Sequence, residues 1–246
     1  MNRALYGFRA KIGLVIPSNN TVIEPELWAM RPPGVTVHGN RILTQGNTPE
    51  GIVEMEKSAT RAVGELRAGQ MSVIVYACLA TSLVKGLGWT RDVALQIASD
   101  ACCPATTAAT ATFEALEALG ARRVAIATPY PDRIQALLPA FVAEFGIDLI
   151  STRNLGVQNS LELWKIPGEE VRALARSVDV PEADAICIVA TDLPTVHEIA
   201  ALERELGKPV VTTNQAIIWK ALALAGLDDP IEGFGTLLGK ARKATA

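Results

Sequence analysis

The sequence predicts an α/β fold in which two pseudo-symmetric halves each contain a mostly parallel four-stranded sheet flanked by helices. The first observation is an internal repeat, since residues 12–17 (IGLVIP) return 112 positions later as residues 124–129 (VAIATP). Residues 35–39 (VTVHG) and 73–78 (VIVYAC) return at the same offset, as IDLIS and AICIVA. The second observation is that short β-branched runs alternate with longer stretches of helical period, which is typical of a parallel sheet with crossover helices.

The predicted strands follow this repeat. They are expected at residues 12–16, 35–38, 73–77 and 105–107 in the first half and at residues 124–128, 147–152, 185–189 and 210–213 in the second. The fourth pair, CPATTA and KPVVTT, recurs at an offset of 105, from residue 103 to residue 208. The second copy is therefore shortened before its last strand.

Helices are expected between the strands, at residues 49–68, 90–99, 110–119, 133–145, 169–178, 195–206 and 215–225. Residues 49–68 give the clearest signal, because Thr48 can cap the helix and Pro49 suits its first turn. Apolar residues from Ile52 to Leu66 then recur at helical spacing. Each half thus has about four strands with helices on both faces, which is a flavodoxin-like arrangement.

The repeat also divides the chain into two units. Residues 1–110 together with residues 215–246 form the first half, and residues 111–214 form the second. No linker rich in Gly, Pro or Ser separates them, so we expect the halves to pack closely and to share a cleft. Because ligands of parallel sheets bind beyond the carboxyl ends of the strands, the candidate site residues are those that follow the strands.

Composition and charge narrow the possible partners. Hydrophobic residues make up 49% of the 246 residues and charged residues 20%, as in a soluble α/β protein. A net charge of −3 argues against nucleic acid as the main partner, since phosphate binding needs a basic surface. No apolar run reaches the roughly 18 residues that span a bilayer, and no signal-peptide core is visible. We therefore expect a cytoplasmic protein without a membrane partner, whose four cysteines are reduced.

Polar residues follow the first strand of each half. Residues 17–21 (PSNNT) include Ser18 and Asn20, and residues 129–132 (PYPD) include Tyr130. Hydroxyl and carboxamide groups beside free backbone N–H groups are neutral donors that suit carboxylate or enolate oxygens. Each segment can equally be a polar turn that caps a helix. The symmetric placement in the two halves favours a binding site.

A cysteine follows the third strand of the first half. Cys78 precedes small and hydroxyl residues, and helix-end N–H groups in such a place can stabilise a thiolate for nucleophilic or proton-transfer chemistry. An isolated cysteine is nevertheless more often an inert buried residue. The repeat pairs Cys78 with Ala190, which has no thiol. Asp192, two residues further on, can act as an acid or base or can cap the next helix.

The sequence shows no sign of a metal or of a cofactor. His38 and His197 are widely separated and lack a Cys/His/Asp cluster, which argues against a zinc site or a Ser-His-Asp triad. Gly233, Gly235 and Gly239 have neither the spacing nor the preceding strand of a phosphate loop. We therefore expect chemistry that needs no cofactor.

Four segments together resemble a known group of enzymes. They are YACLATSLVKG around Cys78, IGLVIPSNNTVIEPE, ARRVAIATPYP and ALERELGKPVVTTNQAIIWKAL. These segments resemble the maleate cis-trans isomerase and arylmalonate decarboxylase branch of the aspartate/glutamate racemase superfamily, and the similarity extends from about Ile12 to Gly226. The resemblance implies two similar α/β halves, a cofactor-free active site at their interface, and chemistry on small mono- or dicarboxylic acids.

The resemblance also implies roles for cysteines. Racemases of the superfamily use two thiols, one from each half, to remove a proton from one face and return it to the other. Maleate isomerases are similar in having two cysteines, the first of which adds to the double bond so that the central bond can rotate. Decarboxylases of the branch keep only the second cysteine, which protonates the enediolate. By position, Cys78 matches the first cysteine and Ala190 replaces the second.

Other positions match substrate-binding places of the group. Asn20 and Tyr130 match residues that hold the substrate carboxylates in isomerases. Ser160 falls where the family has a substrate-binding asparagine, and Asn159 lies one residue earlier. The carboxylate cradle of the group corresponds to Leu79, Ala80 and Thr81, with Thr191 and Asp192 opposite.

The alanine at position 190, either a natural divergence or an engineered substitution, narrows the chemistry. Two-base racemisation loses its partner, whereas addition of Cys78 to an activated alkene needs only the remaining nucleophile. The leading hypothesis is a cofactor-independent isomerase of a small enedioate, impaired or altered by Ala190. The alternatives are an arylmalonate-type decarboxylase or racemase-like enzyme, and a non-catalytic dicarboxylate-binding protein. The resemblance further implies a homodimer or a higher homo-oligomer.

Overall fold

The computed structural model describes residues 5–44 and 48–240, which form two four-stranded parallel sheets. The first sheet has the order β2-β1-β3-β4 and the second the order β6-β5-β7-β8. Their strands are β1 (Ala10–Pro17), β2 (Val35–Ile42), β3 (Val73–Tyr76), β4 (Ala105–Thr107), β5 (Arg123–Thr128), β6 (Asp148–Asn154), β7 (Ala185–Ile188) and β8 (Val210–Thr212). The predicted α/β class with two similar halves is confirmed. The residue boundaries of the halves stay a prediction.

The strand registers reproduce the repeat seen in the sequence. Ile12 of β1 pairs with Val73 of β3, and their counterparts 112 positions later, Val124 and Ala185, pair in the same way. The two copies diverge in the pairing of β5 with β6, which shifts by one residue between Val124 and Ala125. The repeat therefore fixes not only which strands correspond but also how their ends align.

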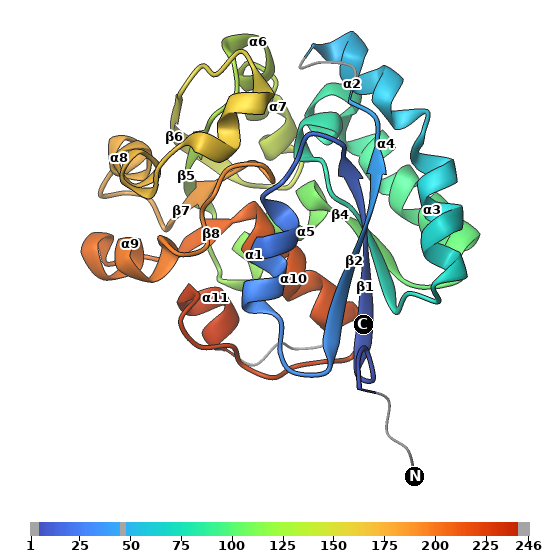
Figure 1. Cartoon of the computed structure of the whole chain (residues 1–246). Coiled ribbons are helices and arrows are strands. Elements are labelled where there is room, and N and C mark those ends of the chain that lie inside the picture. Colours follow the sequence, from blue (N-terminus) through green and yellow to red (C-terminus); the bar gives the residue numbers. More distant parts are fainter. Residues whose placement is uncertain (1–4, 45–47, 241–246) are drawn as a thin grey trace.

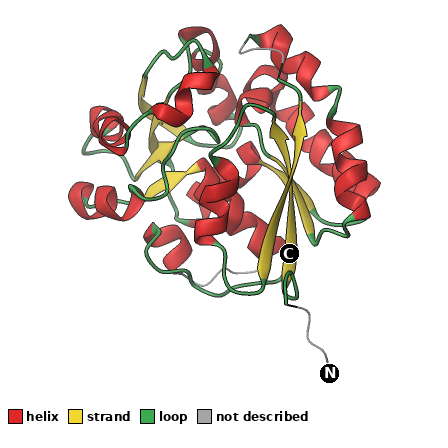
Figure 2. Ribbon diagram, viewed as in Figure 1, coloured by secondary structure: helices red, strands yellow, loops and turns green. Residues whose placement is uncertain are grey.

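Three helices lie between the two sheets (Figures 1 and 2), namely α1 (Ile23–Met30), α5 (Ala108–Ala118) and α10 (Thr213–Leu224). Helix α10 packs against α5 and α1 and contacts strands of both sheets. Its residues from Thr213 to Leu222 are all buried, polar and charged ones included. A helix that is buried on all sides has no solvent-facing polar face. Helix α10 therefore lies in the interior, where it packs against both halves.

The remaining helices pack around the two sheets (Figure 1). They are α2 (Pro49–Glu56), α3 (Ala59–Ala68) and α4 (Leu79–Ala101) on the first half, and α6 (Asp132–Gln135), α7 (Leu138–Ala143), the 3-10 helix η1 (Ser160–Lys165), α8 (Gly168–Val178) and α9 (Ile199–Leu206) on the second. The short helix α11 (Gly235–Gly239) packs against α9 and α10. None of the helices in the described ranges has both the length and the apolar character of a membrane span.

Two of the predicted helices are interrupted. The helix predicted over residues 49–68 is divided into α2 and α3 at Lys57 and Ser58. The helix predicted over residues 133–145 is divided into α6 and α7, because Pro139 lies in the first turn of α7 and has no N–H to continue the preceding hydrogen bonds.

Two other predicted helices begin elsewhere, and three helices were not predicted. Residues 90–99 are only the end of α4, which starts at Leu79 and kinks at Gly86, where φ is 84°. Helix α9 starts at Ile199 instead of residue 195, and the N–H groups of Thr195 and Val196 in the segment before it donate to Glu26. Helices α1, η1 and α11 are short, and the sequence pattern did not predict them.

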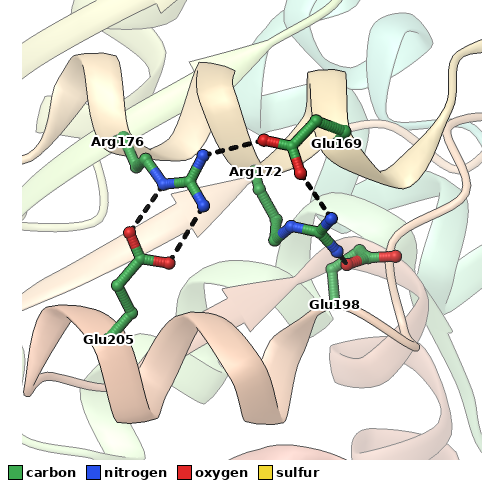
Figure 3. Close-up of polar contacts among 5 residues, drawn as sticks. All are labelled: Glu169, Arg172, Arg176, Glu198 and Glu205. Carbon is green, nitrogen blue, oxygen red and sulfur yellow. Dashed lines mark hydrogen bonds and ion pairs between the residues drawn. The ribbon is translucent and has the colours of Figure 1, made fainter.

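A charged network connects α8 with α9 on the surface of the second half (Figure 3). Arg172 contacts both Glu169 and Glu198, and Arg176 donates to Glu205 at 2.6 Å and to Glu169 at 3.0 Å. Exposed ion pairs of this kind contribute little stability. The network instead holds the start of α9 against α8, since Glu198 is the last residue of the loop that connects β7 to α9.

Candidate active site

A cavity lies between the two halves, at the carboxyl ends of the central strands. Its lining residues from the strand ends are Pro17 and Asn19 after β1, Cys78, Leu79 and Ala80 after β3, Tyr130 after β5, and Thr191 and Asp192 after β7. Thr44, Ile52, Met55, Ser160 and Leu163 complete the wall. The empty space in and around the cavity is about 490 Å³, open solvent included. This is the position where parallel sheets bind ligands.

Hydrogen bonds between the halves bring the two repeated strand ends together. The Thr191 hydroxyl donates to the carbonyl of Ala77 at 3.3 Å, and the Asn20 amide donates to Thr191 Oγ1 at 2.9 Å. The Asn20 side-chain oxygen accepts the N–H groups of Val22 and Ile23 at the start of α1. Asn20 is therefore buried behind Thr191, and it is not one of the residues that line the cavity.

Cys78 lies two residues after the end of β3 and occupies the N-cap position of α4, without a capping hydrogen bond from its side chain. It is 8% exposed and lines the cavity. Burial raises the pKa of its thiol, and the charge of Asp192 raises it further. The Thr81 hydroxyl and the N–H groups of Thr81 and Ala80 oppose this by lowering the pKa of the thiol. Because the balance is upward, the resting form at neutral pH is the thiol.

Thr81 lies beneath the cavity and does not line it. Its hydroxyl is fully buried, and it has no hydrogen-bond partner of good geometry within residues 5–44 and 48–240. The Thr81 hydroxyl nevertheless lies close enough to the Cys78 thiol to lower the pKa of the thiol, and it lowers the pKa of the Tyr76 phenol in the same way. Thr81 thus has a free donor to direct at a thiolate on Cys78.

The second half supplies the cavity with a carboxyl group and a phenol. Asp192 is half-buried, and burial raises the pKa of its carboxyl to about 6. Tyr130 is buried, which raises the pKa of its phenol well above the ordinary value, so it stays a neutral donor. Asp192 does not cap α9, which begins seven residues later at Ile199. The capping role considered for this residue is therefore wrong.

A second cavity adjoins the first on its outer side. It is lined by Ser18, Asn19, Thr44, Gln158, Asn159, Ser160 and Leu161. Asn19, Thr44 and Ser160 line both cavities. The Asn19 amide donates to the Ser160 hydroxyl at 2.9 Å, and Thr44 donates to the Asn19 side-chain oxygen at 2.7 Å. These three residues form the boundary between the inner cavity and the outer one.

Two residues predicted for the site face only the outer cavity. The Ser18 hydroxyl accepts the N–H of Thr44 at 2.9 Å, and Asn159 accepts the N–H of Leu161 at 3.1 Å. The sequence indicated Asn19 only as part of residues 17–21 and missed Thr44, although both follow strand ends and the same rule that selected Ser18 applies to them. It also assigned Ile52 only to a helix core, whereas the residue faces the cavity as well.

The inner cavity has no cationic wall in the described part of the chain. Lys85, Arg133 and Lys165 are not on this wall and have partners elsewhere: Lys85 lies 3.6 Å from Glu56, Arg133 donates to Gln158 at 2.8 Å, and Lys165 lies 2.7 Å from Glu162. No three His, Cys, Asp or Glu side chains gather in a metal-binding arrangement among residues 5–44 and 48–240. An anionic ligand in this cavity would therefore have only neutral donors to bind it.

Ala190 has an unusual backbone conformation. Its φ is 146°, and its N–H donates to Thr213 Oγ1 at 3.2 Å. The residue is 1% exposed, and the cavity is lined by its neighbours Thr191 and Asp192 instead. A non-glycine residue in this region is strained by about 1–3 kcal/mol.

We expect Ala190→Gly to stabilise the protein by about 1 kcal/mol, because relief of backbone strain outweighs the roughly 0.4–1 kcal/mol cost of a more flexible unfolded chain. The matched control is Ala127→Gly in β5, where the same change has no strain to relieve and should destabilise. Urea unfolding of the two variants measures both effects. Equal destabilisation by the two glycines would contradict the prediction.

Comparison with known proteins identifies the family. A family model described as arylmalonate decarboxylase matches residues 12–238. The chain is 34% identical to a maleate isomerase of Nocardia farcinica, over 96% of this chain and 98% of that protein. A structure of that organism's maleate cis-trans isomerase, a Cys-to-Ser mutant with a covalently bound succinylcysteine intermediate, matches with a TM-score of 0.88 at 32% identity, covering 93% of this chain and 98% of that one.

A maleate isomerase of Pseudomonas putida, solved as a Cys-to-Ala variant with maleate, matches with a TM-score of 0.90 at 27% identity, over 94% of this chain and 98% of that chain. The match to the family model covers most of the chain, and the relatives share its two-sheet architecture throughout. The chain therefore belongs to the arylmalonate decarboxylase family, in the branch of the aspartate/glutamate racemase superfamily that contains the maleate isomerases.

Proposed function

We propose that this protein is a cofactor-independent cis-trans isomerase of a small enedioate such as maleate, with Cys78 as the nucleophile. The observation that carries the proposal is the thiol of Cys78 in a cavity shared by both halves, whose wall contains neutral hydrogen-bond donors and the carboxyl group of Asp192. Relatives named maleate isomerase and the succinylcysteine intermediate in one of them support it. A thioether of this kind is what addition of a cysteine to maleate produces.

The proposed reaction begins with addition of Cys78 Sγ to C2 of the cis-enedioate, which places the π-electron pair on C3 and its carboxylate as an enediolate. The former double bond is then a single bond and can rotate. Loss of the sulfur from the rotated species gives the trans product. Each step needs the substrate to be held close to the sulfur and the developing charge to be stabilised by fixed donors.

The donors for the two carboxylates come from both halves. The N–H groups of Leu79, Ala80 and Thr81 lie at the start of α4, where a helix attracts anions. The Tyr130 phenol is neutral and lines the same cavity, and Asn19 and Ser160 face it from the boundary with the outer cavity. The direct carboxylate contact predicted for Asn20 stays a prediction, because its amide here donates to Thr191.

Incubation with maleate, followed by proton NMR, tests this function. We expect the vinyl signal of maleate to be replaced by that of fumarate, and Ala190→Cys to accelerate the conversion by restoring a second thiol. Ala190→Ser is the matched control for the added sulfur, because serine has a volume similar to that of cysteine but no thiol. The absence of fumarate with both the wild-type chain and Ala190→Cys would overturn the proposal.

A second candidate is decarboxylation of a substituted malonate. The description of the matching family model favours it, and protonation of one face of an enediolate needs only one thiol. Against it, the thiol here lies at the position of the first cysteine of the group, not the second. Release of carbon dioxide from an arylmalonate, with one solvent deuteron incorporated at the α-carbon, would favour this reaction over isomerisation.

We also propose that the protein works in the reducing cytoplasm as a homodimer. All four cysteines are free thiols, which suits that compartment. The dimer rests on the resemblance to the family alone. Light scattering at micromolar concentration is expected to give twice the chain mass, and a monomer mass would contradict it.

A further inference from the structure

The proposed isomerisation leaves one proton unassigned. The resting Cys78 is a thiol, so its proton must leave when the sulfur adds to C2, and C3 must receive a proton if the intermediate is to become a stable succinyl thioether. A thiol at position 190 would be the expected partner, but Ala190 has a methyl group and does not line the cavity. The partner must therefore be another group on the cavity wall.

Among the described residues, the cavity wall contains three side chains that can titrate, Cys78, Tyr130 and Asp192. Burial keeps Tyr130 protonated, so it is a poor base. Asp192 is the remaining one, and no side chain of the described residues pairs with its carboxyl group. Its own backbone N–H is the hydrogen bond that lowers its pKa. The carboxyl is thus free to exchange a proton.

Asp192 is also well placed for a reaction with Cys78. It follows β7 on the segment of Ala190, and the hydrogen bond between Thr191 and Ala77 joins that segment to the end of the strand that carries Cys78. The charge of Asp192 raises the pKa of both Cys78 and Tyr130, so its carboxylate lies within electrostatic reach of both. The two groups come from opposite halves and face one cavity.

The segment that carries Asp192 is held from behind. The Asn214 amide donates to the carbonyl of Thr191 at 3.0 Å and to Glu26 at 2.7 Å. Glu26 in turn accepts the N–H groups of Thr195 and Val196. A catalytic carboxyl group needs this kind of support, because its distance to the reacting atoms has to stay constant.

We propose that Asp192 is the acid-base partner of Cys78 and moves one proton between the thiol and C3 of the substrate, in place of the thiol absent at position 190. This inference rests on the proposed isomerase function. Asp192 as carboxylate accepts the proton of Cys78 as the S–C2 bond forms and the C2–C3 π bond breaks. The carboxylic acid then gives this proton to C3.

The reverse steps complete the cycle. After rotation about C2–C3, the Asp192 carboxylate removes a proton from C3, the π bond forms again, and the sulfur leaves C2 as thiolate. The thiolate recovers the proton from Asp192. No proton or electron is gained or lost over the cycle, and both side chains return to their resting forms.

The test compares Asp192→Asn with the wild-type chain on maleate, by kcat and KM between pH 5 and pH 8. We expect Asp192→Asn to lower kcat by on the order of 10²–10⁴ at pH 7.5, the usual share of a general acid-base group, with KM changed much less. Asp148→Asn, an exposed residue at the start of β6, is the matched control and should be active.

The pH profile supplies a readout that a structural role would not change. Because the substrate itself titrates in weak acid, the diagnostic quantity is the ratio of kcat/KM of wild type to that of Asp192→Asn. This ratio should fall as the pH drops through about 6, where Asp192 is protonated. A ratio that stays constant with pH, or a kcat within threefold of wild type, would overturn the proposal.

Alkylation of Cys78 by iodoacetamide separates this inference from the isomerase function. Removing the negative charge of Asp192 should lower the pKa of the thiol, so alkylation of Asp192→Asn should become fast at a lower pH than in wild type. An unchanged alkylation profile would overturn the pairing of the two groups, even if fumarate forms. Wild-type chain that forms no fumarate while the profile shifts would overturn the isomerase function and the proton transfer to C3 together.

Discussion

Cys78→Ser is expected to abolish isomerisation of maleate, with kcat reduced by on the order of 10³-fold or more, as for the loss of other nucleophiles. The serine hydroxyl keeps the shape of the side chain at the start of α4 but does not ionise near neutral pH, so no covalent adduct forms. Proton NMR measures the loss of fumarate. Mass spectrometry of acid-quenched wild type should show an added mass of one maleic acid that the variant lacks.

The matched control for Cys78→Ser is Cys103→Ser. Cys103 is only half-buried and does not line the cavity, so the same exchange of sulfur for oxygen should leave kcat within about twofold of wild type, as changes outside the site and the core usually do. If Cys78→Ser kept more than a tenth of the activity, or if the adduct formed on another cysteine, Cys78 would not be the nucleophile.

The fold was predictable because the repeat encodes it twice. Ile12 pairs with β3, and Val124, 112 positions later, pairs with β7 in the same way. The repeat therefore predicted that the segments after β3 and β7, which carry Cys78 and Asp192, face one cavity. Buried parallel strands are continuous apolar runs, and such runs are easy to recognise. The rule that ligands bind beyond the strand ends then selected most of the residues now found there.

The parts that escaped prediction depend on contacts between distant residues. The hydrogen bond between Asn19 and Ser160 joins residues 141 positions apart, and no local pattern in either segment indicates it. The segment before α9 is held by Glu26, far away in the sequence, which accepts the N–H groups of Thr195 and Val196. Local propensity indicates where a helix can form, but it carries no information about such tertiary hydrogen bonds.

Glu26→Ala is expected to be the most destabilising single change outside the apolar core, by about 3–5 kcal/mol. The carboxylate is 6% exposed and accepts hydrogen bonds from Thr195 N at 2.6 Å, Val196 N at 3.0 Å and Asn214 Nδ2 at 2.7 Å. Alanine leaves the N–H groups of Thr195 and Val196 without this acceptor in a buried place, and the Asn214 amide keeps only its bond to the carbonyl of Thr191. Urea unfolding measures the loss.

The stability of Glu26→Gln, measured at two pH values, distinguishes the effect of the charge of Glu26 from the effect of its shape. Burial raises the pKa of Glu26 above its ordinary value of 4.5, so the folded chain holds this proton more tightly than the unfolded chain. The resulting stability is fully present below pH 4.5 and is lost as the pH rises through the folded-state pKa. The stability of wild type relative to Glu26→Gln should therefore be greater at pH 4 than at pH 8, and the raised pKa of Asp192 cancels because both chains contain it.

The matched control is Glu24→Ala, in the same helix but partly exposed and paired with Arg41, which should cost at most about 1 kcal/mol. Because Glu26 and Asn214 together hold the segment of Thr191 and Asp192, Glu26→Gln should also lower kcat while the chain remains folded. A Glu26→Ala chain as stable as Glu24→Ala would mean that the interface between the halves does not depend on this carboxylate, and the support assigned to Asp192 would fail with it.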